Sequence, residues 1–201
     1  ATLTPEQFAD GCGEVVKHAV IADPELFAEL EKTPLTLELL NRDVARVALI
    51  IARNIDIKRA VVVADERETN QRKLLNFGHS AGHAVEACEH FELGHGNCVS
   101  IGMGIITRAA ALHGICDAEL PGRIEELCAR HGLKTRCELS ADAVFAEALH
   151  DKKRAGDTID LVIPHGIGRC SIDRTPLSTF HDLIAEGLGQ KLSLIHISEP
   201  T

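Results

Sequence analysis

The sequence predicts a mainly α-helical bundle with one small β hairpin. Apolar residues recur at helical spacing, separated by helix-capping residues, from Thr4 to about residue 153. Only after Gly156 does the pattern change, to two short β-branched segments around a glycine-containing turn. With 201 residues, 45% of them hydrophobic, the chain is long enough to bury a core of its own.

The first third of the chain predicts three helices. Residues 4–7 form a start signal, because threonine can cap the helix, proline suits its first position and glutamine follows three residues after the cap. This helix should run to about Ala22, and the Asp-Pro pair at 23–24 should start the next one. Residues 37–64 carry apolar side chains at helical spacing, which predicts one long, mostly buried helix despite its β-branched end.

The remaining elements follow a polar connection at residues 64–73, which has no apolar period and should form a surface loop or lid. Further helices are expected at about 75–88, 97–115, 121–131 and 141–153, with a turn at 94–96 and a cap at Ser140. The hairpin is expected from residue 158 to 173, and a last helix from about Ser178. No internal repeat is visible.

Composition excludes several classes of function. The 21 basic and 30 acidic residues give a net charge of −9, which argues against a general nucleic-acid binder, and Tyr and Trp are absent as stacking platforms. No apolar run approaches the ~20 residues of a membrane span, and no signal pattern opens the sequence. Seven cysteines without a C-x-x-C pair favour buried thiols in a reducing cytosol over disulfides or a thiolate metal site. We therefore expect a soluble, cytoplasmic protein.

A histidine cluster is the first indication of a functional site. His79 and His83 stand four residues apart and would share one helix face, and His95 beyond the following turn could supply a third metal ligand. The H-x-x-x-H pattern alone is weak, since such histidines can equally face solvent or form hydrogen bonds. Gly78 and Gly82 favour a site, because glycines that cost about 1 kcal/mol each in a helix would clear space for something bulky.

Four polar residues near this cluster could converge on an oxyanion: Lys58, Arg72, Asn76 and His83. Each alone is also consistent with a solvated surface residue. Together with a metal ion, they indicate a pocket for an anionic, hydroxylated substrate.

Four segments resemble, in order and at near-identical spacing, the signature blocks of the 3-dehydroquinate synthase family. They read "GEVVKHAVIAD", "DERETNQRKLLNFGHSAGHAVEA", "HGNCVSIGM" and "DKKRAGDTIDLVIPHGIG". The resemblance extends from Thr2 to about Asp182. It implies the C-terminal, mainly helical domain of a two-domain enzyme, whose α/β NAD-binding domain with its glycine-rich loop is absent from this chain.

The resemblance also implies roles for individual residues. The zinc ligands would be Glu14, His79 and His95, so His83 would be a catalytic or phosphate-contacting residue and not a ligand. Lys17 and Lys58 would act with His83 on the substrate. The other implied contacts are substrate-binding Arg72, Asn76 and Lys152, the last uncertain against Lys153, and Thr2 near NAD.

The implied reaction converts 3-deoxy-D-arabino-heptulosonate 7-phosphate to 3-dehydroquinate and phosphate, in the shikimate route to chorismate and the aromatic amino acids. It uses zinc, or another divalent metal such as cobalt, and NAD that is regenerated in each turnover. A homodimer is also implied. Three rivals stay open: a sibling cyclase acting on sedoheptulose 7-phosphate or glucose 6-phosphate, a metal-dependent alcohol dehydrogenase of related fold, and a non-catalytic metal-binding bundle.

Other polar residues receive simpler interpretations. Glu86 could hydrogen-bond a ligand imidazole or simply lie on a helix face. The remaining histidines of interest are expected to be exposed polar residues: His18, His90, His113, His131, His150 and His165. Residues 192–201 resemble a translated sequencing adapter, so the native domain is expected to occupy residues 1–191.

Overall fold

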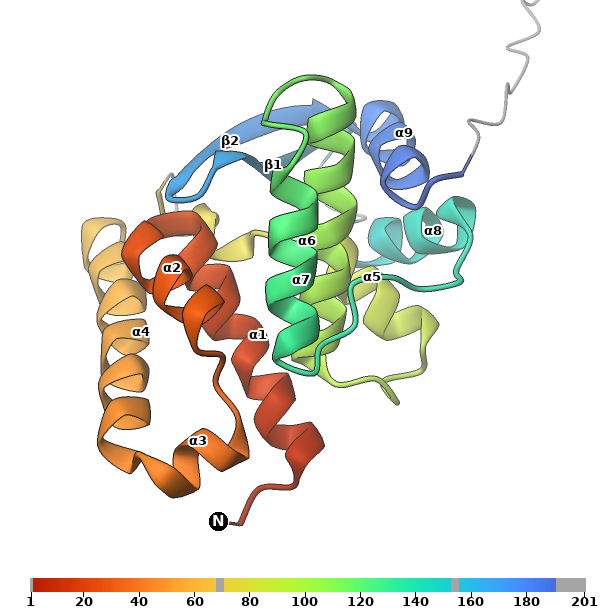
Figure 1. Ribbon diagram of the computed structural model, residues 1–201. Helices are drawn as coiled ribbons and strands as arrows, with labels where there is room; N and C mark the ends of the chain where they lie inside the picture. Colours follow the sequence, from red (N-terminus) through yellow and green to blue (C-terminus); the bar gives the residue numbers. More distant parts are fainter. Residues whose placement is uncertain (1, 68–70, 153–155, 191–201) are drawn as a thin grey trace, which may run out of the picture.

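The computed structural model describes residues 2–67, 71–152 and 156–190. In chain order its elements are α1 (Pro5–Ala22), α2 (Pro24–Lys32), α3 (Leu37–Arg42), α4 (Val44–Ala64), the 3-10 helix η1 (Gln71–Asn76), α5 (His79–Cys88), α6 (His95–Leu112), α7 (Leu120–Arg130), α8 (Ala141–Lys152), β1 (Thr158–Gly166), β2 (Arg169–Pro176) and α9 (Leu177–Gly187). The predicted helical bundle with one hairpin is confirmed (Figure 1).

Helix α6 lies at the centre of the bundle. It packs against α1, α5, α7 and α9 (Figure 1), and most of its side chains are buried. Its sequence is apolar on every side, as expected of a helix surrounded by others. None of the described helices combines the length and hydrophobicity that crossing a bilayer requires.

The caps that were predicted at the helix starts are present. Thr4 and Gln7 form a complete capping box at the start of α1, in which the Gln7 backbone N–H donates to Thr4 Oγ1 over 3.2 Å. Asp23 caps α2 and Ser140 caps α8, each accepting from a backbone N–H three residues later.

The β hairpin closes one end of the bundle, at the top in Figure 1. Its strands pair antiparallel from Thr158 opposite Pro176 to Gly166 opposite Arg169. Gly168 in the turn has φ +75°, a conformation that favours glycine, and its N–H donates to Val20 O of α1 over 2.7 Å. This bond ties the hairpin to the helix that carries Glu14.

The single long helix expected at residues 37–64 is wrong in two respects. The helix breaks at Asp43, which ends α3 and whose carboxylate caps α4 by accepting from Arg46 N–H over 3.0 Å. Helix α4 is also mostly exposed: Val47 and Ile50 are its buried residues, whereas Leu49 is 71% exposed. The apolar residues of α4 surround the helix, and the described chain covers only one side of it.

Two further boundaries differ from the prediction. The helix expected from Leu75 to Cys88 is two elements, η1 and α5, separated where Gly78 adopts φ +77°. A left-handed residue cannot continue an α-helix, so α5 begins at His79. The turn expected at residues 94–96 is shorter, because His95 is already the first residue of α6. Part of the polar connection at 64–73 also belongs to η1.

Two histidines expected at the surface are buried. His18 is 2% exposed and His131 is 4% exposed. His131 is a satisfied core residue: its Nδ1 pairs with Leu127 O over 2.7 Å, and its Nε2 accepts from Leu35 N–H over 3.0 Å. Its pKa is lowered, first of all by burial.

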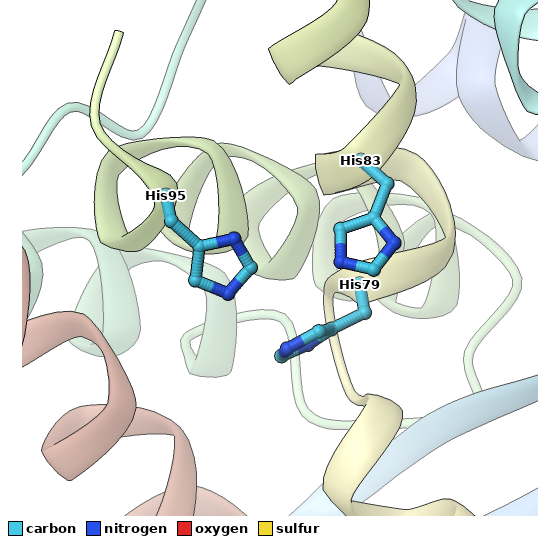
Figure 2. A group of neighbouring side chains, drawn as sticks. All are labelled: His79, His83 and His95. Atoms are coloured by element: carbon cyan, nitrogen blue, oxygen red, sulfur yellow. The ribbon is translucent and has the colours of Figure 1, made fainter. Parts of the chain in front are cut away.

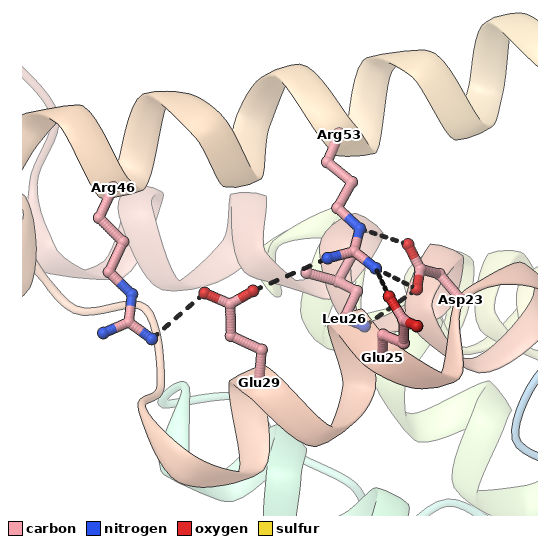
Figure 3. Close-up of polar contacts among 6 residues, drawn as sticks. All are labelled: Asp23, Glu25, Leu26, Glu29, Arg46 and Arg53. Atoms are coloured by element: carbon pink, nitrogen blue, oxygen red, sulfur yellow. Dashed lines mark hydrogen bonds and ion pairs between the residues drawn. The ribbon is translucent and has the colours of Figure 1, made fainter.

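Arginines on α4 anchor this helix to α2 (Figure 3). The Arg53 guanidinium donates two hydrogen bonds of 2.6 Å to the two carboxylate oxygens of Asp23, and Arg46 donates one of 3.2 Å to Glu29. Burial of Asp23 opposes its ionisation, but the bonds from Arg53 and the Leu26 amide outweigh it and lower the pKa of Asp23.

Asp23→Ala should therefore destabilise the fold more than Asp43→Ala does. Both aspartates cap a helix, and losing a cap costs about 1 kcal/mol. Only Asp23 also holds an arginine fork, which should raise its cost to about 2–3 kcal/mol. Urea unfolding followed by circular dichroism measures both variants. Equal losses would mean that the fork contributes nothing to stability.

Candidate metal centre

Three imidazoles and one carboxylate meet where α1, α5 and α6 approach one another. His79 and His83 lie on the first turns of α5, and His95 is the first residue of α6 (Figure 2). Their ring centroids are 5.2 Å, 5.3 Å and 5.6 Å apart. Glu14 reaches this group from α1. The cluster is therefore assembled from side chains of three separate helices.

Glycines allow these helices to approach closely. A Cβ atom on Gly82 would lie 2.8 Å from Cys98 O of α6, and one on Gly13 of α1 would lie 2.7 Å from Gly96 O. The expectation that Gly78 and Gly82 clear space for a bulky ligand is therefore wrong. The backbone and side chains of α6 occupy that space, and the glycines position the histidines indirectly.

Glu14 completes a triangle of candidate ligand atoms. Its Oε1 lies 3.5 Å from His79 Nε2 and 4.0 Å from His95 Nε2. This oxygen is buried and has no hydrogen-bond partner among the described residues. Ligand atoms around a tetrahedral zinc ion, with bonds of about 2.0–2.2 Å, lie about 3.3–3.6 Å apart. The three atoms thus fit a divalent cation after small side-chain movements.

Hydrogen bonds at the far ring nitrogens orient two of the imidazoles. His79 Nδ1 lies 3.1 Å from Phe77 O, and His95 Nδ1 lies 3.3 Å from Glu86 Oε2. Both acceptors require the proton on Nδ1, which leaves a lone pair on each Nε2 directed towards Glu14. Glu86 therefore has the geometry of the first of its two predicted roles, a partner of a ligand imidazole.

His83 offers an alternative third ligand. One nitrogen from each of the three imidazoles lies within 4.8 Å of the others. His83 differs from its neighbours, however, because it is exposed and no hydrogen bond within the described chain fixes its tautomer. Its position suits a group that meets substrate beside the metal better than a fixed ligand.

Lys17 favours the ionised form of the Glu14 carboxylate. The Lys17 ammonium is buried one turn along α1 and donates to Glu14 Oε2 over 2.6 Å. Burial acts to raise the pKa of Glu14, but the Lys17 charge and the nearby imidazoles outweigh it, so that pKa is lowered. Burial, reinforced by the Lys17 charge, lowers the pKa of His79 to about 4. At neutral pH the site presents a carboxylate and a neutral imidazole, the forms that bind metal.

Two cavities meet at this cluster and share Asn76 and His79. The smaller, about 250 Å³, is lined by six predicted site residues and by His18 and Leu75. The six are Glu14, Lys17, Lys58, Arg72, Asn76 and His79. The larger, about 990 Å³, adds His83 and residues of α8 and the hairpin. The described chain thus brings together the four residues expected to converge on an oxyanion: Lys58, Arg72, Asn76 and His83.

Thr2 lies outside this convergence, and two further predictions fall on residues outside the described part of the structure. Thr2 is exposed at the start of the chain, before α1. Lys152 is the last residue of α8, but its side chain is outside the described part of the structure, and so is Lys153. Residues 192–201, the expected non-native tail, also lie outside the described residues.

Sequence reasoning missed His18 and Lys73 at the site. His18 lines the smaller cavity, and Lys73 lines the larger one while donating to Asp160 Oδ2 over 2.6 Å. A signal existed for His18, because it stands four residues after Glu14 and shares its helix face. Burial and the Lys17 charge lower the pKa of His18, so its imidazole is neutral.

The residues of this site lie within the segment that the chain shares with known proteins. A family model described as 3-dehydroquinate synthase C-terminal matches residues 11–154, which include Glu14, the cations of the smaller cavity and the three histidines. The chain belongs to this family. The 3-dehydroquinate synthase of Streptococcus suis is 37% identical over 178 residues, and that of Acetivibrio thermocellus is 38% identical over 177 residues.

The matches cover 88% and 86% of this chain but 49% of each relative, so the chain spans about half the length of the 3-dehydroquinate synthases it matches. Solved structures confirm the fold. The 2-epi-5-epi-valiolone synthase of Streptomyces hygroscopicus, solved with NAD+ and Zn2+, gives a TM-score of 0.81 at 24% identity over 94% of this chain and 52% of its own. A 2-deoxy-scyllo-inosose synthase solved with carbaglucose-6-phosphate, NAD+ and Co2+ gives 0.72 at 21% identity over 92% and 52%.

Proposed function

We propose that this chain is the metal-binding half of a 3-dehydroquinate synthase, which converts 3-deoxy-D-arabino-heptulosonate 7-phosphate to 3-dehydroquinate and phosphate. One observation carries the proposal: the buried Glu14 Oε1 faces two imidazoles whose Nε2 atoms point towards it, beside a cavity lined by lysines and an arginine. A metal ion and an anionic substrate would complete both features.

Glu14, His79 and His95 would hold zinc, or cobalt in its place, and leave a coordination position for substrate hydroxyls. When bound, the metal would supply Lewis acidity to a hydroxyl, and NAD would accept and return a hydride. Within the small cavity, Lys58 and Arg72 would bind the substrate carboxylate, and Lys17 would donate to a hydroxyl near Glu14. His83 and Asn76, on the larger cavity, would face the phosphate together with Lys152.

The charge and exposure of these groups suit the chemistry. Phosphate elimination needs a proton acceptor near the leaving group, and His83 is the exposed imidazole closest to the ligand triangle. The cations would hold the substrate by both ends, which keeps intermediates in position through successive steps. The chain's own contribution is thus orientation, charge neutralisation and a proton relay.

The complete protein would include parts that this chain lacks. An N-terminal α/β domain would bind NAD, with Thr2 near the cofactor and residues 1–191 forming the C-terminal domain. The complete enzyme would be a homodimer of the shikimate pathway in the cytoplasm, and the seven cysteines, all free, support a reducing compartment. Residues 192–201 would not belong to the native protein.

The test completes the chain with the missing half, from its natural reading frame or from the Streptococcus suis relative. Phosphate release is followed with zinc and NAD, using the heptulosonate phosphate, sedoheptulose 7-phosphate and glucose 6-phosphate in parallel. Release from the acid alone, without net NADH, is expected, and a His79→Ala variant serves as the inactive control. Preference for a neutral sugar would indicate a sibling cyclase, and accumulating NADH would indicate a dehydrogenase.

A further inference from the structure

His18 is a buried imidazole with an unsatisfied nitrogen directly behind the Glu14 carboxylate. Its side chain is 2% exposed, and its Nε2 has no hydrogen-bond partner within the described chain. Glu14 Oε2 lies 3.8 Å from this nitrogen, on the same helix face. A buried polar atom without a partner is unfavourable, so a role for this nitrogen is expected.

Asn54 fixes the other side of the ring. As placed, the atom facing His18 Nδ1 is Asn54 Oδ1, which reaches it from α4 over 2.6 Å. The oxygen and nitrogen of an asparagine amide can exchange places without changing its shape. With the NH₂ group towards Nδ1, Asn54 donates to the ring, and the ring proton lies on Nε2, facing Glu14. This arrangement is the one in which each group faces a complementary partner.

Glu14 has room for this second donor. Its Oε2 accepts from Lys17 over 2.6 Å and retains another lone pair, whereas Oε1 faces His79 and His95. If His18 Nε2 closed from 3.8 Å to hydrogen-bond distance of Oε2, two donors would hold the carboxylate with Oε1 turned towards the imidazoles.

We propose that His18, itself held by Asn54, is a positioning residue that orients the Glu14 carboxylate for metal binding. The inference rests on the metal site proposed above, and it links α4 to the ligand on α1. Partners behind metal ligands of this kind are commonly worth about 10- to 100-fold in metal affinity.

The experiment measures Co²⁺ binding to the full 201-residue chain, by chelator competition and by the visible spectrum of the bound ion. His18→Phe, which keeps ring volume but removes both nitrogens, should weaken binding about 10- to 100-fold and alter the Co²⁺ bands. His18→Gln, whose amide nitrogen can replace Nε2–H, should restore most of the affinity. Asn54→Leu should weaken binding in the same direction, and its effect should largely vanish in the His18→Phe background.

A matched control is His113→Phe, because His113 is an exposed histidine that pairs with Glu186 away from the site. Thermal unfolding of the metal-free variants checks that each is folded, and Asn54→Leu carries the test should His18→Phe fail to fold. Wild-type affinity and spectra in His18→Phe, or in Asn54→Leu, would overturn the inference. Absence of binding by the wild-type chain, or binding insensitive to His79→Ala, would instead count against the metal site itself.

Discussion

Replacing Glu14 by glutamine should lower the metal affinity of the chain by at least about 100-fold, because even the partners behind metal ligands are worth 10- to 100-fold. Glutamine keeps the shape of the side chain but removes the negative charge that faces His79 and His95. His79→Ala and His95→Ala should have effects of similar size, since each removes an oriented Nε2. Isothermal titration with Zn²⁺ at neutral pH measures all three variants.

His83→Ala is the comparison that decides between the two possible ligand sets. If Glu14 is the third ligand, this variant should bind metal within a few-fold of wild type, and so should His90→Ala at an exposed position on the loop before α6. Proximity alone would favour His83, because its nitrogen lies within 4.8 Å of those of the other two histidines. Tight binding by Glu14→Gln together with loss of binding in His83→Ala would establish a three-histidine site instead.

Local signals in the sequence were sufficient for most helices. The Thr4–Gln7 capping box and the Asp23 and Ser140 caps depend only on residues within one turn, so they formed as predicted. The hairpin, expected at residues 158–173 and observed at 158–176, was likewise indicated by its composition. The helix boundary inside the long apolar segment 37–64 was not predicted. The apolar period continues through Asp43, but its carboxylate caps a new helix there.

Burial was harder to predict than secondary structure, because it depends on which elements meet. His131 is buried by a contact with Leu35, far away in the sequence. Helix α4 has the apolar composition of a core helix, yet Ile55 is 59% exposed because the described chain packs on one side only. Periodicity within one segment cannot reveal whether a second segment covers it.

Site features were likewise predictable where they depend on local spacing and not where they depend on which helices meet. The spacing of His79, His83 and His95 indicated a metal centre. Glu14 lies on a helix that is far from these histidines in the sequence, and it was assigned only through the family resemblance. The glycines at 78 and 82 were recognised as unusual, but their cause was misjudged. They accommodate α6, and the histidines are aligned because the two helices can approach closely.

Gly102→Ala should therefore destabilise the protein and damage the metal site together. A Cβ atom on Gly102 of α6 would lie 2.0 Å from Gly78 O and 2.8 Å from Gly82 N, both backbone atoms that cannot move without displacing the start of α5. Overpacking of this kind typically costs 1–3 kcal/mol, and contact with rigid backbone places the expected loss at about 3 kcal/mol or more. Because α5 begins with His79, metal affinity should fall as well.

Gly122→Ala is the matched control, since it makes the same chemical change on a neighbouring helix. Gly122 is exposed on α7, and apart from its chain neighbours and the nearby backbone of its own helix, a Cβ there would meet no described atom within 4 Å. Alanine lowers the entropy of the unfolded chain and favours helix, so this variant should be about 0.5 kcal/mol more stable. Urea unfolding and Zn²⁺ titration of the pair separate close helix packing from a general effect of glycine. If Gly102→Ala were as stable as wild type, the α5–α6 approach would have to relax freely, and the alignment of the histidines would need another cause.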